Sequence, residues 1–263
     1  MFNFLRVSTS NGIAELVLDN APKANAMGLG FWSELPQALE WLDKQTDVRV
    51  IILKGEGRHF SAGADMELLE HLFSFAGGDD LALGCESLRA EILKLQNAFN
   101  RIEDTRVPVV AADHGACIGA GLDMIAACDL RLCSADARFC LKEIDFGIVA
   151  DVGSGQRLRH IIGFSRLSEL MYTGEAFDAG EAKAMGLVSK VLDDKDALYA
   201  EADRLASLIA SKSALTIRGV KRNLLFSRDN SVRDGLEYVA TWNAFALLNG
   251  DCGAALADSK KRE

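Results

Sequence analysis

Three acidic residues lie close together along a stretch of the sequence that is otherwise rich in glycine and apolar residues. Asp123 follows Gly119-Ala120-Gly121-Leu122, and Glu143 and Asp151 come shortly after it. Ionised side chains are seldom found in apolar surroundings, because removing a charge from water costs free energy. Carboxyl groups that are kept in such a setting are typical of proton-transfer chemistry.

Each of these acids also has a purely structural interpretation. Asp151 is suited to be the N-cap of a helix that begins near Val152, which is a common use of aspartate. Asp123 fits a solvated position on a helix, and Glu143 fits a charge at the rim of a site, paired with Lys142. The acids alone leave both interpretations open.

Two glycine-rich turns each follow a predicted buried strand, at residues 61–64 (SAGA) and 119–121 (GAG). Each turn can open a helix whose first backbone N–H groups have no partner, and two such groups aimed at one point form an oxyanion hole, worth about 3–4 kcal/mol per donor. Close helix–strand packing is the alternative for either turn alone. Neither turn follows the GxGxxG or GxxxxGK[ST] pattern of nucleotide-binding loops.

The elements around the two turns predict an α/β fold. Residues 5–9 and 12–19 predict a hairpin of strands, and the apolar runs at 48–53 and 107–112 predict strands that are covered on both faces. A further strand is expected at 129–133, and helices at 32–44, where Pro36 is tolerable only in the first turn, at 86–103 and from about residue 122. We interpret Gly77 to Asp80 as a mobile loop that interrupts a helical stretch.

The pattern changes to almost continuous helix from about residue 195, with helices expected at 198–211, 214–226 and 232–248. We therefore divide the chain into residues 1–193, which form the core with the active site, and residues 194–263, a helical region that serves as a lid or in oligomerisation.

Composition narrows the class of partner. The chain has 263 residues, and its 38 acidic and 29 basic residues give a net charge of −9, which argues against nucleic acid or an anionic membrane. No apolar run approaches the ~20 residues of a membrane span, and a cytoplasmic location is expected. The six cysteines form no CxxC pair and the four histidines lack metal-ligand spacing, so we expect reduced core cysteines and no metal.

Five sequence pieces, in order over nearly the whole chain, resemble the crotonase, or enoyl-CoA hydratase/isomerase, superfamily. They are residues 20–26 (NAPKANA), 60–65 (FSAGAD), 114–121 (HGACIGAG), 127–131 (ACDLR) and 156–158 (QRL). The resemblance implies a crotonase-like ββα spiral core, a C-terminal helical trimerisation region in a homotrimer or homohexamer, and an acyl-CoA thioester substrate. It implies no cofactor, because coenzyme A is part of the substrate.

The same resemblance implies roles for particular residues. The thioester oxygen would lie between the backbone N–H groups of Ala64 and Ala120, although the family usually has glycine at the second position. Removing a proton beside a thioester develops negative charge on that oxygen, which is where those donors point. Contacts with coenzyme A would come from Lys23, Asn25, Ala26, Ala62 and Asp65.

The acids separate members of the family. Hydratases have glutamates at the positions of Asp123 and Glu143 and tend to have a Pro-Gly pair at the position of Ala150-Asp151. The trio Asp123, Glu143 and Asp151 instead resembles the Δ3,5-Δ2,4-dienoyl-CoA isomerases. By that resemblance Glu143 takes a proton from carbon 2, Asp151 delivers one to carbon 6, and Asp123 tunes and orients both.

The sequence therefore predicts an isomerase of fatty-acid β-oxidation that converts a 3,5-dienoyl-CoA into a 2,4-dienoyl-CoA. The enzyme alternatives are an enoyl-CoA hydratase and a Δ3-Δ2-enoyl-CoA isomerase of the same superfamily. An alternative of another class is a non-catalytic relative that binds acyl-CoA or RNA, against which the three retained acids argue.

Overall fold

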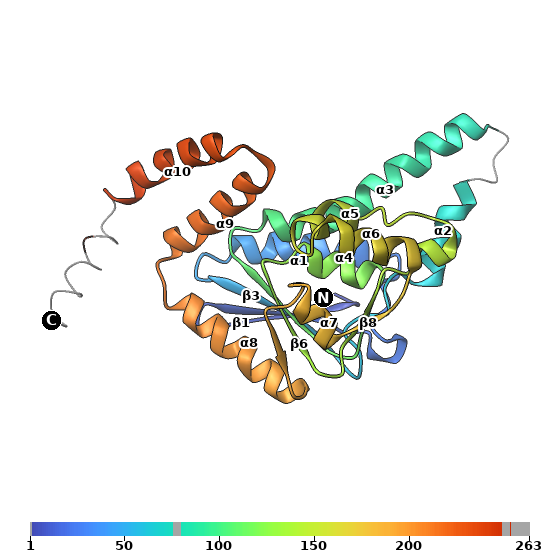
Figure 1. The fold of residues 1–263 in the computed structure, drawn as a ribbon, viewed down its shortest axis with the longest axis horizontal. Helices are drawn as coiled ribbons and strands as arrows, with labels where there is room; N and C mark the ends of the chain where they lie inside the picture. The colour runs from blue at the N-terminus through green and yellow to red at the C-terminus, as the bar shows by residue number, and fades with distance from the viewer. Residues whose placement is uncertain (1, 76–79, 249–252, 254–263) are drawn as a thin grey trace.

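A large, mostly parallel sheet forms the centre of the molecule (Figure 1). The computed structural model describes residues 2–75, 80–248 and 253 of the chain. Within these residues the sheet has the strand order β1-β2-β3-β4-β6-β9, in which β1 and β2 form the expected antiparallel hairpin and the later neighbours are parallel. The strands are β1 (Leu5–Ser10), β2 (Ile13–Leu18), β3 (Val50–Gly55), β4 (Val109–Asp113), β6 (Leu130–Ser134) and β9 (Lys190–Leu192).

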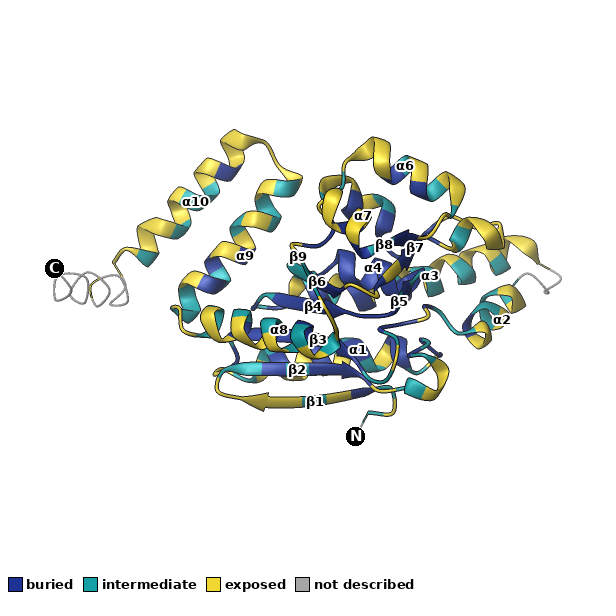
Figure 2. Ribbon diagram, turned by 60° about the horizontal axis from the view of Figure 1, so that its bottom comes forward, coloured by how far each residue is buried: buried dark blue, intermediate teal, exposed yellow. Residues whose placement is uncertain are grey.

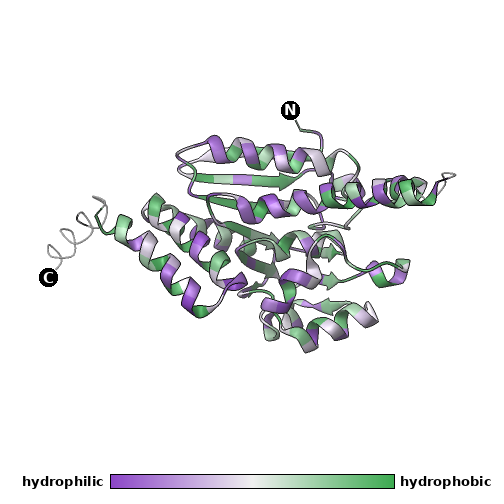
Figure 3. Ribbon diagram, turned by 90° about the horizontal axis from the view of Figure 1, so that it is seen from above, coloured by the Kyte–Doolittle hydropathy of each residue, from purple (hydrophilic) through white to green (hydrophobic). Residues whose placement is uncertain are grey.

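Alternation along β3 explains why its sequence is apolar throughout. Val50 and Ile52 pack with α8 (Lys195–Ala210) on one face of the sheet, whereas Ile51 and Leu53 belong to the core on the other face. That second face is covered by α1 (Phe31–Lys44) and α3 (Leu81–Asp104), which pack against each other. The expected two-sided coverage is confirmed, and Figures 2 and 3 show the buried, hydrophobic strands between helices of mixed character.

A second, smaller sheet lies beside the first and contains β5 (Ala116–Ile118), β7 (Arg138–Cys140) and β8 (Phe177–Asp178). β5 pairs in parallel with β7, and β7 pairs antiparallel with β8. Single bridges between Ser61 and Cys117 and between Met27 and Ala64 attach the segment at residues 61–64 to this sheet and to the loop near residue 25. The small sheet thereby brings both glycine-rich turns to one place.

The remaining helices are short, apart from a C-terminal pair. They are α2 (Met66–Ser74), α4 (Ala120–Ala126), α5 (Ser154–Arg157), α6 (Phe164–Thr173), α7 (Ala179–Ala184), α9 (Ala214–Asp229) and α10 (Val232–Ala246), with 3₁₀ turns η1 (Ala21–Lys23), η3 (Glu143–Phe146) and η4 (Leu158–His160). The predicted elements are present with ends shifted by a few residues. Helix α3 begins earlier than expected, because the Asp80 side chain caps it by accepting hydrogen bonds from the N–H groups of Ala82 and Leu83.

Two local predictions were wrong. Pro36 lies beyond the first turn of α1, and the helix continues because the buried side chains of Leu35, Leu39 and Leu42 outweigh the hydrogen bond that proline removes. Asp151 is not an N-cap, since α5 starts at Ser154 and Gly153 holds the cap position. Most of the loop expected at Gly77 to Asp80 lies outside the described residues.

The C-terminal helices differ in how they meet the core. Helix α8 lies on the sheet, whereas α9 and α10 pair with each other and extend away from it (Figure 1). The boundary between residues 193 and 194 stays a prediction. Lys221 of α9 is only 2% exposed and attaches this pair of helices to the core. Its ammonium group donates to the carbonyls of Ile102 and Val107, to Thr105 Oγ1 and to Asp129 Oδ2, at 2.9–3.1 Å.

Replacing this lysine tests the attachment. In Lys221→Met the four acceptors lose their donor and Asp129 loses its cationic partner, so the free energy of unfolding falls by about 3–5 kcal/mol. Urea denaturation followed by circular dichroism measures it. Lys212→Met, which removes an exposed lysine at the start of the same region, changes that free energy by no more than about 0.5 kcal/mol. Equal losses in the two variants would contradict the anchoring role.

Candidate active site

The two glycine-rich turns lie directly against each other. Ser61 N–H donates to the Ala116 carbonyl at 2.9 Å, and Ile118 N–H donates to the Ser61 carbonyl at 3.0 Å. Between them Gly63 adopts φ +90°, and a Cβ atom there would lie 2.6 Å from the Ile118 carbonyl oxygen and 3.4 Å from Ala120 N. Only glycine permits this approach, so the first turn sits beside the N–H of the second.

Ala64 and Ala120 both line one cavity of about 280 Å³. Within the described residues, neither N–H donates a hydrogen bond to the protein. Ala120 is the first residue of α4, where a helical N–H has no carbonyl partner. Ala64 is bridged to Met27 through its neighbours, Gly63 O and Asp65 N, which leaves its own N–H free. This arrangement fits the expected oxyanion hole.

Two of the three acids line the same cavity. Glu143 opens η3, and its Oε1 lies 3.3 Å from where a Cβ on Gly119 would stand, so its carboxylate is close to the Ala120 turn. Asp151 reaches the cavity from an irregular segment before α5 and is half-buried.

The third acid is placed differently. Asp123 is fully buried on α4, and its Oδ1 accepts a hydrogen bond from Ser154 N–H at 2.6 Å. It is absent from the lining of the cavity, whereas Glu143 and Asp151 belong to it. Asp123 therefore joins the start of α5 to α4 from behind the site.

Burial raises the pKa of all three carboxyl groups. The pKa of Asp123 rises to about 7, first because the side chain is removed from water and then because Glu143 and Asp151 carry like charge, against the opposing hydrogen bond from Ser154. The pKa of Glu143 is raised by burial and by Asp151, and that of Asp151 by burial. Since three carboxylates this close cannot all ionise at little cost, a protonated carboxyl near neutral pH is expected.

Apart from Lys142, the side chains that line the rest of the cavity are apolar. Trp32 comes from α1, Leu68, Leu69 and Leu72 from α2, and Leu95 from α3. Phe146, Ile148 and Val152 close it near the acids. The site can thus hold a flexible hydrocarbon chain next to a pair of N–H donors and two carboxyl groups.

The residues predicted to contact coenzyme A gather at one end of the site but do not all offer side chains. Lys23 is exposed and its Nζ lies 2.9 Å from Asp65 Oδ2. Asn25 is 3% exposed, and its side-chain amide donates to the carbonyls of Glu56, His59 and Phe60. Its φ is +54°. Asn25 therefore shapes the loop that carries Ala26 rather than presenting a free amide. The same loop accepts a hydrogen bond from Ala62 N–H.

Several residues of the site were not predicted from the sequence. The N–H of Ser154 and the side chain of Gln96, which bonds to the Asp151 carbonyl, belong to this group. Arg157 belongs to the Gln-Arg-Leu piece at residues 156–158, for which the resemblance implied no role, and its side chain lies directly behind the Asp151 segment. The Gln-Arg-Leu motif was the signal that could have found it.

Within the described part of the chain, no group of histidine, cysteine, aspartate or glutamate side chains could hold a metal ion. Cys117, Cys128, Cys133 and Cys140 are buried free thiols, as expected, and Cys85 is exposed. Among the described residues no helix has the length and apolar character needed to cross a membrane.

A ββα core that presents two free N–H groups and acidic side chains to an apolar cavity defines the crotonase class of enzymes. The chain belongs to the enoyl-CoA hydratase/isomerase family, whose model matches residues 8–240. This confirms the expected superfamily and its fold.

Individual proteins agree with this assignment. The chain is 44% identical to the peroxisomal Δ3,5-Δ2,4-dienoyl-CoA isomerase of Arabidopsis thaliana over 96% of its length and 91% of the relative. It is 41% identical to the mitochondrial Δ3,5-Δ2,4-dienoyl-CoA isomerase of Mus musculus, over 93% and 75% of the two chains. Its fold matches a candidate enoyl-CoA hydratase from Thermobifida fusca YX, solved in complex with acetoacetyl-CoA, with a TM-score of 0.82 and 28% identity over 93% and 94%. The expected likeness to the dienoyl-CoA isomerases is confirmed.

The raised pKa of Asp123 gives a stability test. Because the folded protein holds this proton to about pH 7 while the unfolded chain releases it near the ordinary aspartate pKa, the contribution of Asp123 to the free energy of unfolding falls as pH rises from about 4 to 7. Asp123→Asn keeps an acceptor for Ser154 N–H and cannot ionise, so its loss over this range is smaller than that of the wild type. Denaturation at stepped pH measures the difference.

Proposed function

We propose that this enzyme is a dienoyl-CoA isomerase that converts a 3,5-dienoyl-CoA into the 2,4-dienoyl-CoA. Its likeness to the isomerases of Arabidopsis thaliana and Mus musculus supports the substrate class. The acetoacetyl-CoA complex of the Thermobifida fusca protein supports an acyl-CoA ligand for this fold. The reaction needs no cofactor, since the coenzyme A group belongs to the substrate.

The observation that carries the proposal is which acids reach the cavity. Addition of water to a 2-enoyl thioester needs two carboxyl groups that hold one water molecule. In this chain Asp123, at the position of the first hydratase glutamate, lies behind the cavity and bonds to Ser154. Glu143 and Asp151 line the cavity instead, and the Glu143 carboxylate lies beside the Ala120 turn. A base near the thioester and an acid farther along the chain suit double-bond migration.

The steps follow from this placement. The Glu143 carboxylate takes the proton from carbon 2, and the electron pair of that C–H bond forms a dienolate whose charge reaches the thioester oxygen. The N–H groups of Ala64 and Ala120 stabilise that oxygen. Asp151, whose pKa is raised by burial, then gives a proton to carbon 6, which leaves double bonds at carbons 2 and 4. Asp123 orients α5 and limits the charge that its neighbours carry.

The metabolic pathway and the cellular location of the protein are part of the same proposal. A dienoyl-CoA isomerase acts on intermediates of fatty-acid β-oxidation. The cytoplasmic location expected from the sequence stays a prediction, and the two isomerase relatives carry peroxisomal and mitochondrial names.

Removing the proton donor tests the mechanism. Asp151→Asn keeps the size of the side chain but cannot deliver the proton, so turnover of a 3,5-dienoyl-CoA, followed by the absorbance of the conjugated product, falls by about 10²–10⁴-fold. Binding of a saturated acyl-CoA by calorimetry stays intact. Asp145→Asn is the matched control and keeps wild-type turnover. Unchanged turnover in Asp151→Asn removes this residue from the mechanism, and rapid hydration of a 2-enoyl-CoA by a wild type without dienoyl turnover favours the hydratase alternative.

The assembly expected from the resemblance, a homotrimer or homohexamer, has a surface to support it. Leu224 of α9 and Leu236 and Phe245 of α10 are each at least 63% exposed, although they are large apolar side chains. Such side chains on helices that extend from the core are typical of an interface between subunits.

Sedimentation equilibrium tests the assembly. The wild type should have three or six times the mass of the chain. Leu224→Glu places a charge on the α9–α10 surface and should shift the protein toward smaller species, whereas Leu29→Glu, at an exposed leucine before α1, should not. A monomeric wild type would contradict this part of the proposal.

A further inference from the structure

The backbone that carries Asp151 has no regular structure of its own. Residues 147–153 connect η3 to α5 and contain neither helix nor strand. The segment begins at Gly147 with φ +71° and ends at Gly153 with φ +132°. Its position is therefore determined by the side chains that hold its carbonyl groups rather than by a helical or sheet ladder.

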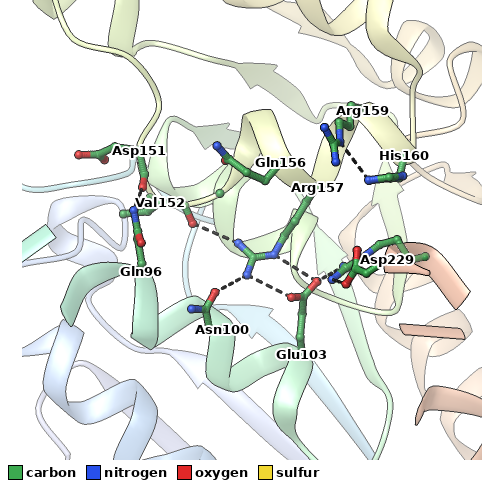
Figure 4. A pocket seen from close by; sticks show the side chains of 12 residues that line it. Gln96, Asn100, Glu103, Asp151, Val152, Gln156, Arg157, Arg159, His160 and Asp229 are labelled. Carbon is green, nitrogen blue, oxygen red and sulfur yellow. Dashed lines mark hydrogen bonds and ion pairs between the residues drawn. The ribbon is translucent and has the colours of Figure 1, made fainter. Parts of the chain in front are cut away.

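Those side chains come from one face of α3 and from α5. Gln96, Asn100 and Glu103 are spaced four and three residues apart, so they project from the same side of α3 (Figure 4). Gln96 donates from Nε2 to the Asp151 carbonyl at 2.7 Å. The helix that forms the wall of the cavity thus also holds the backbone of its acid.

Arg157 makes the second attachment. Its side chain is 7% exposed, and Nη1 donates to the Val152 carbonyl at 3.2 Å while Nη2 donates to Asn100 Oδ1 at 2.6 Å. A Cβ on Gly153 would stand 1.8 Å from Nη1, so the guanidinium fills the space that this glycine leaves. The Asp151 carboxylate points away from the group in Figure 4, which excludes a direct ion pair with Arg157.

Glu103 offsets the free-energy cost of burying the Arg157 guanidinium. Its Oε1 lies 3.2 Å from Arg157 Nε, and its Oε2 accepts from Nη2 at 3.2 Å. Burial pushes the pKa of Glu103 upward, but hydrogen bonds from Arg228 and Arg157 outweigh it and the pKa is lowered. Glu103 therefore stays ionised and keeps the guanidinium plane in one orientation.

We propose that Arg157 is a positioning residue for the isomerisation: paired with Glu103 and Asn100, it holds the 151–153 turn so that Asp151 faces carbon 6 of the substrate. It acts on the backbone of the turn and does not touch the substrate. The inference rests on the proposed function for the role of Asp151, whereas the effect of Arg157 on the turn does not depend on it. A misplacement of about 1 Å of a reacting group is enough to cost about 100-fold in rate.

Kinetics of Arg157→Gln and Arg157→Lys test the proposal. We expect kcat for a 3,5-dienoyl-CoA to fall by about 100-fold in Arg157→Gln, with KM changed by no more than roughly threefold, and Arg157→Lys to recover part of the loss. Arg101→Gln is the matched control, because Arg101 is a partly buried arginine on α3, the helix of Asn100 and Glu103, and pairs with Asp43 at 3.3 Å. Its kcat stays within roughly threefold of the wild type.

Proton exchange separates positioning from general damage. Glu143 is untouched in Arg157→Gln, so exchange of the carbon 2 proton in D₂O, measured by NMR on the recovered substrate, continues while isomerisation is lost. Equal loss of exchange and isomerisation overturns the proposal, and so does an unchanged kcat. If the arginine variants do not fold, Gln96→Leu decides, since it removes only the bond to the Asp151 carbonyl and is expected to lower kcat by about 10-fold.

A crystal structure of the same variant distinguishes this inference from the proposed function. We expect residues 151–153 to be displaced from the cavity in Arg157→Gln while Glu143 stays in place. An unmoved turn overturns the positioning role even where the wild type is active. A wild type without dienoyl-CoA turnover rejects the proposed function, and a displaced turn would then still support the attachment by Arg157.

Discussion

The close approach of two backbone turns is the constraint on which the rest of this structure depends. Gly63 lies so near the Ile118 carbonyl and Ala120 N that no side chain fits between them, and this contact brings the turns of Ala64 and Ala120 to one cavity. Backbone donors fixed in this way need no reorganisation when charge develops on a ligand oxygen, which is the condition for strong electrostatic stabilisation. The small sheet and the buried Ser61 serve to hold this contact.

The positions of the acids follow from the same geometry, because each is connected, directly or through a neighbouring acid, to the helix that Ala120 begins. Asp123 is on the helix that Ala120 begins, Glu143 lies over Gly119, and Asp151 precedes the helix whose first N–H binds Asp123. The three carboxylates carry like charge in a poorly solvated place, so they repel one another. This repulsion raises the fraction of carboxyl groups that are protonated, which a proton donor requires. In the proposed mechanism, the burial that lowers the stability of the fold at higher pH also favours the protonated carboxyl group that the reaction uses.

The sequence predicts which strands, turns and acids form this site better than it predicts where each acid lies relative to the cavity. Periodicity and apolar runs identify the strands, and the quoted motifs identify the acids and the turns, since these depend on local residue types. Which acid reaches the cavity depends on contacts between distant segments, such as Ser154 with Asp123 and Gln96 with Asp151, for which no local pattern exists. Pro36 shows the reverse case, in which a strong local rule is overridden by burial of one helix face.

One carboxylate connects the two regions into which the sequence divides. Glu103 at the end of α3 binds Arg157 from the core and Arg228 from α9, so the pair of C-terminal helices and the segment of Asp151 share a partner. Lys221 contacts the same end of α3 through the Ile102 carbonyl. A shift of α9 relative to the core would move Arg228 and so change the ion pairs of Glu103. Through Arg157, that change would reach the segment that carries Asp151. The position of α9 and the placement of Asp151 are therefore physically linked, because both depend on the same turn of α3.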